Sequence, residues 1–187
     1  MKQNGFSLLE LLAGLGIFGV MAAVALPTLR SLGNDAYIRG AARIFQGEFR
    51  KARSIAVRQN RYAAIRFERN EAGAEFSVYV DGNGNGVRSD DIEDGVDERI
   101  AGPFPLHGHA PGVRVGINEG VPAIEGGALD PHDPIRFGRS DILSFSPLGT
   151  STPGTFYLAG DATQGAVRVT NNGRVRLLVW HGTWLED

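Results

Sequence analysis

The sequence contains no cysteine. A disulfide framework, a thiolate metal site and a cysteine nucleophile are therefore excluded. Cysteine-free chains occur in both the cytoplasm and the periplasm, so this absence does not identify the compartment.

An excess of charge is also missing, because 19 lysines and arginines stand against 21 aspartates and glutamates, which gives a net charge of -2. The whole molecule is therefore not a polycation suited to nucleic acid or anionic lipid. Any basic site must be local.

The motifs of common enzymes are absent as well, since there is no G-x-S-x-G elbow and no G-K-[ST] phosphate loop. His107, His109 and His132 lie in stretches rich in glycine and proline, without the helical spacing of a metal site. We therefore expect no enzymatic activity and no cofactor, apart from the calcium site considered below.

What the sequence does contain is enough apolar material for a core, at 42% of 187 residues, and one long apolar run. Residues 6–29 carry a single charge, Glu10, and follow a short polar segment, residues 1–5. A helix over this run is long enough to cross the roughly 30 Å hydrocarbon core of a membrane. Lys2 favours a cytoplasmic N-terminus. We therefore predict a transmembrane helix over residues 6–29, with the rest of the chain outside.

A cleaved secretory signal peptide is the alternative interpretation, because Ala23-Val24-Ala25 has the form of an A-x-A cleavage site. The mature chain would then begin at Leu26. Glu10 argues against this, since a carboxylate in an apolar segment costs about 2.5 to 3.5 kcal/mol and is usually retained for a purpose.

After Pro27 the pattern becomes amphipathic, which predicts that the helix continues over residues 30–58 with a bend near Pro27. The apolar residues recur at helical period and are Tyr37, Ala41, Phe45, Phe49, Ala52 and Ala56. Arginines occupy the other side at positions 39, 43, 50 and 53.

The remaining residues, 59–187, alternate in the manner of β-strands separated by long connections rich in glycine and proline. The expected strand regions are 62–68, 75–80, 113–117, 142–146, 155–158 and 166–180. A helix followed by strands predicts an α+β fold, here a long N-terminal helix packed on one antiparallel sheet.

The start of the apolar run, Gly5-Phe6-Ser7-Leu8-Leu9-Glu10-Leu11-Leu12, resembles the class III leader junction of type IV pilins and type II secretion pseudopilins. In that family a prepilin peptidase cuts after the glycine and methylates the new terminal amine. The resemblance implies a leader over residues 1–5, cleavage between Gly5 and Phe6, and N-methylation of Phe6. It also implies assembly roles for Glu10 and for Pro27, which stands where these proteins commonly carry a helix-bending proline.

The position of Glu10 has a chemical reason. The amine freed by cleavage is a cation, and a carboxylate one turn along a neighbouring helix can neutralise it inside the membrane or filament core. The alternatives are a carboxylate that reaches the membrane interface or that is protonated.

Three later stretches are similar to one branch of the superfamily, the GspH/FimT-like minor pilins and pseudopilins. They are residues 53–61, Phe145-Ser146-Pro147-Leu148-Gly149 and Asn172-Gly173-Arg174-Val175-Arg176. The resemblance implies a single-pass protein of the bacterial inner membrane, with its C-terminal domain in the periplasm, that joins other pilins in a filament used for secretion. It further implies a role in filament initiation or at the tip.

The last hairpin can adopt two registers. A three-residue loop, Asn171-Asn172-Gly173, pairs Val169 with Val175 and keeps one face apolar, whereas a two-residue loop breaks that face. The first register is therefore expected. It gathers Arg168, Arg174 and Arg176 on the other face, in a G-R-x-R context that resembles the DNA-binding motif of FimT-type pilins. The alternative is an ordinary solvated strand face.

Two further features carry alternatives. Asp81-Gly82-Asn83-Gly84-Asn85-Gly86 has the spacing of the first half of a calcium loop, with Asp81, Asn83 and Asn85 as ligands, but a tight turn explains it equally. Residues 30–69 carry a net charge of +7 and residues 81–98 a net charge of -6. These opposite patches either complement each other between subunits or are solvated surface.

Overall fold

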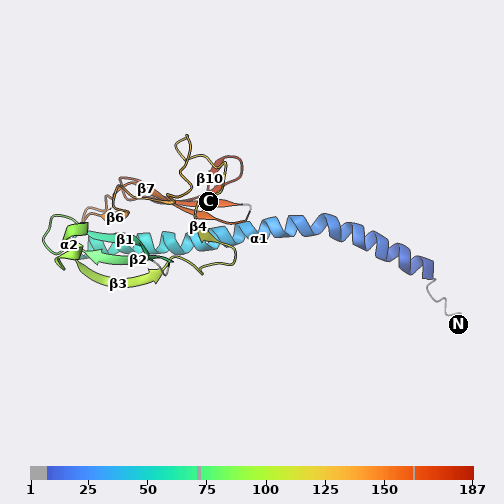
Figure 1. The fold of residues 1–187 in the computed structure, drawn as a ribbon, viewed down its shortest axis with the longest axis horizontal. Helices are drawn as coiled ribbons and strands as arrows, with labels where there is room; N and C mark the ends of the chain where they lie inside the picture. The colour runs from blue at the N-terminus through green and yellow to red at the C-terminus, as the bar shows by residue number, and fades with distance from the viewer. Residues whose placement is uncertain (1–7, 71–72, 162) are drawn as a thin grey trace.

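The computed structural model describes residues 8–70, 73–161 and 163–187. Its longest element is the helix α1, Leu8–Gln59, which continues through Pro27 without interruption. The N-terminal part of α1 extends away from the rest of the molecule, and it bends in the portion beyond the β domain (Figure 1). Within the described residues, no helix combines the length and the apolar character that a membrane crossing needs.

The C-terminal half of α1 packs against the β domain along one apolar face, as the spacing predicts. The buried residues of this face are Ile38, Ala41, Ala42, Phe45, Phe49, Ala52, Ile55 and Ala56. The prediction for Tyr37 was wrong, since 46% of this residue is exposed. Ile38, one position along and therefore turned by about 100°, takes its place against the domain.

The first sheet has four antiparallel strands in the order β3-β2-β1-β6. The strands are β1, Ala63–Asn70; β2, Gly73–Val80; β3, Glu98–Pro105; and β6, Ile142–Phe145. A short helix, α2, Ser89–Glu93, lies in the connection between β2 and β3. Figure 1 shows α2 at the end of the domain where α1 ends.

The second sheet is antiparallel too, in the order β10-β9-β8-β7-β4, with β5 also paired to β7. Its strands are β4, Arg114–Val115; β5, Ile135–Arg136; β7, Gly154–Ala159; β8, Gln164–Val169; β9, Val175–Trp180; and β10, Trp184–Glu186. The prediction of a single sheet was therefore wrong, whereas the α+β class is confirmed. The strands β3, β5 and β10 were not predicted. Most side chains of β3 are exposed, so it lacks the alternating burial on which the prediction depended.

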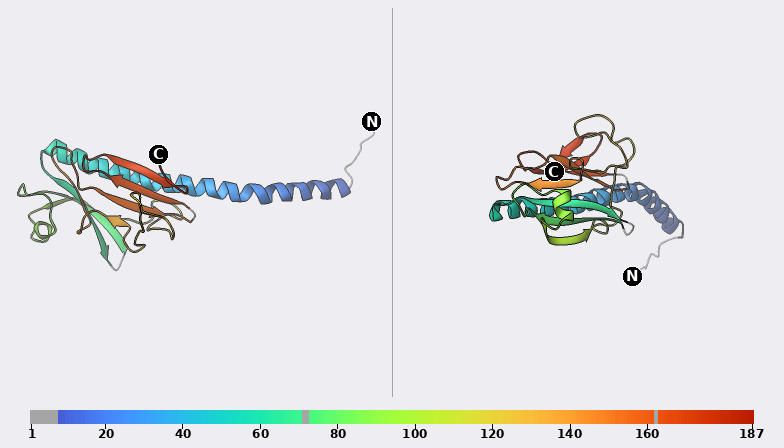
Figure 2. Two further views of the ribbon diagram at one scale, coloured as in Figure 1. Left: turned by 90° about the horizontal axis from the view of Figure 1, so that it is seen from above. Right: turned by 60° about the vertical axis from the view of Figure 1, so that its left-hand side comes forward.

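One hydrophobic core joins α1 to both sheets. The ring of Phe45 lies 4.5 Å from that of Phe156 on β7 and 6.3 Å from that of Phe76 on β2, between centroids. Phe49 likewise contacts Phe67 on β1, at 6.1 Å. Figure 2 shows α1 running along the domain, with strands of the two sheets spreading away from it. The helix therefore holds the two sheets together through this shared core.

Candidate functional site

Three stretches that are far apart in the sequence meet beside α1. The side chain of Arg53 donates through Nε to the carbonyl oxygen of Gly149, at 3.0 Å. Gly173, at the tip of the β8–β9 hairpin, packs against the same carbonyl. These residues belong to the three stretches whose resemblance was noted in the sequence. The resemblance therefore corresponds to one physical junction between α1, the β6–β7 turn and the last hairpin.

The junction requires glycine at position 173. Its φ is +73°, in the left-handed region, and a Cβ there would lie 2.0 Å from the oxygen of Gly149 and 2.8 Å from Nε of Arg53. Backbone bonds secure the contact, since Ser151 N donates to Asn171 O at 2.9 Å. The hairpin tip is thus closely fitted to the helix and to the β6–β7 turn.

The register of the last hairpin is the one predicted. Val169 pairs with Val175 and Val167 with Leu177, and both pairs are buried against α1. Arg168 stands opposite Arg176 on the other face. The loop is Asn171-Asn172-Gly173, closed by a bond from Thr170 N to Arg174 O at 3.1 Å.

Next to the junction lies a groove of about 400 Å³ between α1 and β9. We call it the arginine groove, because four arginines line it, namely Arg50, Arg53, Arg174 and Arg176. Gln46 donates to the carbonyl of Val175 at 3.3 Å and so links the helix to β9 on one side of the groove.

Two carboxylates at the end of the chain occupy one end of the arginine groove. Asp187 forms ion pairs with Arg39 and with Arg43, the latter at 3.0 Å. Glu186 lies 3.3 Å from Arg174 and 3.4 Å from Arg176. Asp187 N also donates to Leu177 O at 3.1 Å, so β10 places both acids. The groove is therefore built to hold carboxylates on an extended segment.

Two family models match this chain. The prokaryotic N-terminal methylation motif matches residues 1–26. The model described as type II transport protein GspH matches residues 41–173, which is more than half of the chain and includes Arg53, Gly149 and Gly173. The chain belongs to the GspH family. The resemblance noted in the sequence is confirmed, and so is the absence of an enzymatic role, because this is a family of structural subunits.

A curated relative supports the same placement. The pilin-like protein PilA1 of Thermus thermophilus is 36% identical over 85 residues, which is 46% of this chain and 53% of PilA1. The chain spans about half the length of this curated relative. No solved structure matches the chain.

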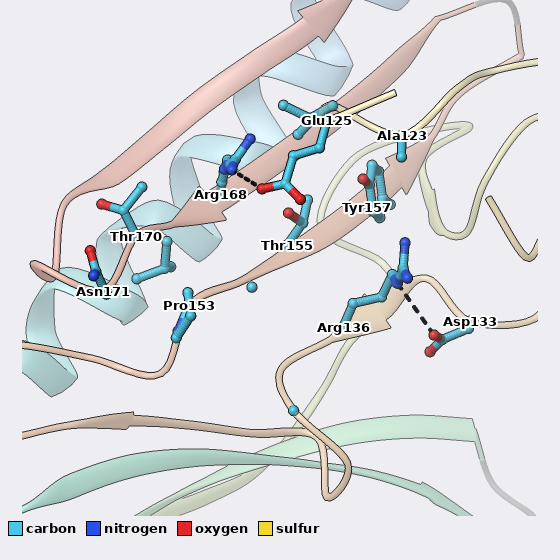
Figure 3. Close-up of a pocket in the computed structure, with 14 residues that line it drawn as sticks. Ala123, Glu125, Asp133, Arg136, Pro153, Thr155, Tyr157, Arg168, Thr170 and Asn171 are labelled. Carbon is cyan, nitrogen blue, oxygen red and sulfur yellow. Dashed lines mark hydrogen bonds and ion pairs between the residues drawn. The ribbon is translucent and has the colours of Figure 1, made fainter. Parts of the chain in front are cut away.

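In this GspH-family chain, the three arginines predicted to bind DNA do not share one groove. Arg174 and Arg176 line the arginine groove, whereas Arg168 lines a separate groove of about 620 Å³ over β7 and β8. In Figure 3, Arg168 pairs with Glu125, and Arg136 pairs with Asp133 elsewhere in the same groove, at 3.5 Å. The hairpin itself has no acid, but the fold brings carboxylates to all three arginines from elsewhere in the chain.

Tyr157 is the buried titratable group of this second groove. Only 2% of the residue is exposed, and this burial raises the pKa of its phenol, although a hydrogen bond with the backbone of Ile124 partly offsets the effect. The phenol therefore stays neutral at physiological pH and serves as a hydrogen-bonding group.

The loop after β2 uses its leading aspartate as an internal acceptor. Oδ1 of Asp81 accepts from the amides of Asn83 and Gly84, at 3.0 and 2.8 Å, and Oδ2 accepts from Gly86 at 3.0 Å. Asp97 closes the loop by accepting from Gly82 at 2.9 Å. Within residues 8–70, 73–161 and 163–187, no group of three or more His, Asp or Glu is placed to hold a metal ion.

Calcium binding by Asp81, Asn83 and Asn85 stays a prediction, and calorimetric titration of the full chain in detergent tests it. A bound ion would share the Asp81 carboxylate with the amides that now occupy it. Heat of binding and a higher melting temperature in calcium, both lost in Asp81→Asn, would support the site. If calcium produced neither change, the loop would be only a turn.

The processing residues Gly5 and Phe6 lie outside the described residues. Glu10 lies in the first turn of α1 and is exposed there. Pro27 lies within α1. Their roles in processing and assembly therefore stay predictions.

We expect Gly173→Ala to lower the free energy of unfolding of the full chain by about 3 kcal/mol, since a Cβ adds a clash to the strain of a left-handed backbone. The matched control is Gly182→Ala, because Gly182 has a φ of +80° but nothing within 4 Å of its Cβ position. It should cost only about 1 to 2 kcal/mol. Urea unfolding in detergent measures both, and equal losses would show that the junction with Gly149 is not tightly packed.

Proposed function

We propose that this chain is a minor pilin or pseudopilin subunit of a type II secretion pseudopilus or a type IV pilus. A prepilin peptidase cuts it between Gly5 and Phe6 and methylates Phe6. The subunit then assembles with other pilins through the N-terminal half of α1. Within the filament it acts in initiation or at the tip.

The observation that carries this proposal is the apolar N-terminal part of α1. Its described large side chains, over residues 8–21, are exposed on every side of the helix. Those between 59% and 78% exposed are Leu8, Leu9, Leu11, Leu12, Leu15, Ile17, Phe18, Val20 and Met21. So large an apolar surface requires another apolar phase. Lipid provides it before assembly, and the helices of other subunits provide it in the filament.

The same surface supports a location in the bacterial inner membrane. Residues 6–29 form the single-pass anchor, residues 30–58 continue the helix into the domain, and residues 59–187 form a periplasmic β domain. The methylation motif that matches residues 1–26 supports this arrangement.

Mass spectrometry of the mature protein from its host tests the proposal. The expected chain begins at Phe6 and carries one added methyl group. A chain that begins at Leu26 would identify a cleaved signal peptide and a secreted binding protein. An unprocessed Met1 would also contradict the proposal.

DNA uptake is the second candidate function, because the fold adds Arg50 and Arg53 of α1 to Arg174 and Arg176 of the last hairpin. Contacts with phosphate make binding strongly dependent on salt. The test is the retardation of duplex DNA by the full chain in detergent at several salt concentrations. Arg174→Gln with Arg176→Gln should weaken binding and reduce its salt dependence, and unchanged mobility of the DNA at low salt would remove this function.

A further inference from the structure

The arginine groove has unequal ends. Glu186 and Asp187 fill one end, as described above. At the other end, Arg50 has no carboxylate within ion-pair distance among the described residues. Arg53 is held there by its bond to Gly149, so its position is fixed.

The charge of the groove is not balanced by the chain itself. Four arginines and two acids line it, which leaves an excess of two positive charges. The groove is therefore suited to a further acidic segment.

The chain contains one segment of the complementary kind, in and after α2. Asp90, Glu93, Asp94 and Glu98 are exposed there. Val96, which is 41% exposed, adds apolar contact surface to this segment. Its ion pair within the described structure is the weak contact of Glu93 with Arg66, at 3.6 Å. Residues 90–98, which we call the acidic segment, are thus largely available to a partner.

The groove and the acidic segment lie at different positions along α1. The acidic segment lies at the end of the domain where α1 ends, whereas the C-terminus, which closes one end of the groove, lies nearer to the point where α1 leaves the domain (Figure 1). If the arginine groove of one copy binds the acidic segment of another, the second copy is therefore displaced along the axis of α1. Because the two surfaces differ, the contact is heterologous.

We propose that the arginine groove receives the acidic segment of a second copy of this chain. This inference rests on the proposed function and deepens it by naming a contact between subunits. Complementary charge sets the orientation of the two copies, and the filament core supplies the affinity.

Cysteine cross-linking in the host tests this contact, because the natural chain contains no cysteine. Two full-length copies with different tags are expressed together, one with Arg50→Cys and the other with Asp94→Cys. Mild oxidation should produce a mixed dimer that carries both tags. The control pair replaces Asp94→Cys with Glu119→Cys, an exposed acid in a different loop, and should give at most about a tenth of that dimer.

A charge exchange then separates attraction from mere proximity. Adding Arg174→Glu to the first copy should reduce the mixed dimer several-fold, and adding Asp90→Arg to the second copy should restore much of it. A cross-link from Arg50→Cys to a different pilin, or equal yields with the control pair, would overturn the inference. It would also be overturned if Arg174→Glu abolished the retardation of duplex DNA while no mixed dimer formed.

The same samples keep the two proposals apart. Mass spectrometry identifies the mature N-terminus, and co-purification of the subunit with filaments measures its incorporation. If the chain begins at Phe6 and is incorporated but gives no mixed dimer, the contact is wrong and the proposed function stands. If the chain is not processed, both fail.

Discussion

Replacing Phe45 with alanine should lower the free energy of unfolding of the full chain by about 3 to 5 kcal/mol. Phe45 is 1% exposed and contacts both sheets, through Phe156 at 4.5 Å and Phe76 at 6.3 Å between ring centroids. It also meets the ring of His109 edge-on, at 5.0 Å. Truncation opens a cavity where the helix and two sheets join, and none of these elements can close it without moving the others. Urea unfolding in detergent measures the loss.

Ile44→Ala is the matched control, because Ile44 is the preceding residue on the same helix and is 44% exposed. We expect it to change the free energy of unfolding by about 0.5 kcal/mol or less. Similar losses for the two variants would mean that α1 stabilises the domain through general helix content and not through its phenylalanine face.

The elements that the sequence predicted well are those with local patterns. The amphipathic stripe of α1 and the register of the last hairpin both follow from side-chain period, because a shift of one residue would bury polar groups. Tyr37 was misplaced because the helix meets the domain along a face that begins at Ile38. The start of a contact face depends on the partner surface, which no local pattern contains.

Local patterns predicted neither the division of the strands into two sheets nor the strand β3. β3 contains Gly102, Pro103 and two charged residues, and most of it faces solvent. Its pairing with β2 is irregular, with register shifts near Val78. A strand of this kind is defined by the backbone bonds it makes with its neighbour and not by its own alternation.

The arginine groove shows the same limit for the candidate site. Arg174 and Arg176 were singled out from the hairpin alone, but Arg50, Arg53 and the acids Glu186 and Asp187 reach the groove from other elements. Contacts such as that of Arg53 with Gly149, 96 residues apart, depend on the tertiary fold. Local sequence therefore predicted the two cations of the hairpin, while the helix arginines and the carboxylates that accompany them were found in the groove only through the structure.

Replacing Glu10 with leucine should abolish incorporation of this subunit into filaments. The proposed role of Glu10 is to neutralise the terminal ammonium of a neighbouring subunit in an apolar surrounding. Without it, that ammonium is buried and uncompensated, which costs about 3 to 5 kcal/mol and lowers incorporation by more than about a hundredfold. Immunoblotting of sheared filaments against total membrane protein measures the ratio.

Three variants separate the charge of Glu10 from its size and from general effects on the helix. Glu10→Gln keeps the shape and removes the charge, so it should fail as Glu10→Leu does, whereas Glu10→Asp should retain part of the incorporation. Glu48→Gln removes another carboxylate of α1, one that lies 3.6 Å from Lys51 within the same subunit, and should assemble normally. All variants should still be cut and methylated at Phe6. Normal assembly of Glu10→Gln would show that the carboxylate has no ammonium to meet, because a neutral amide cannot replace a counter-charge in an apolar core.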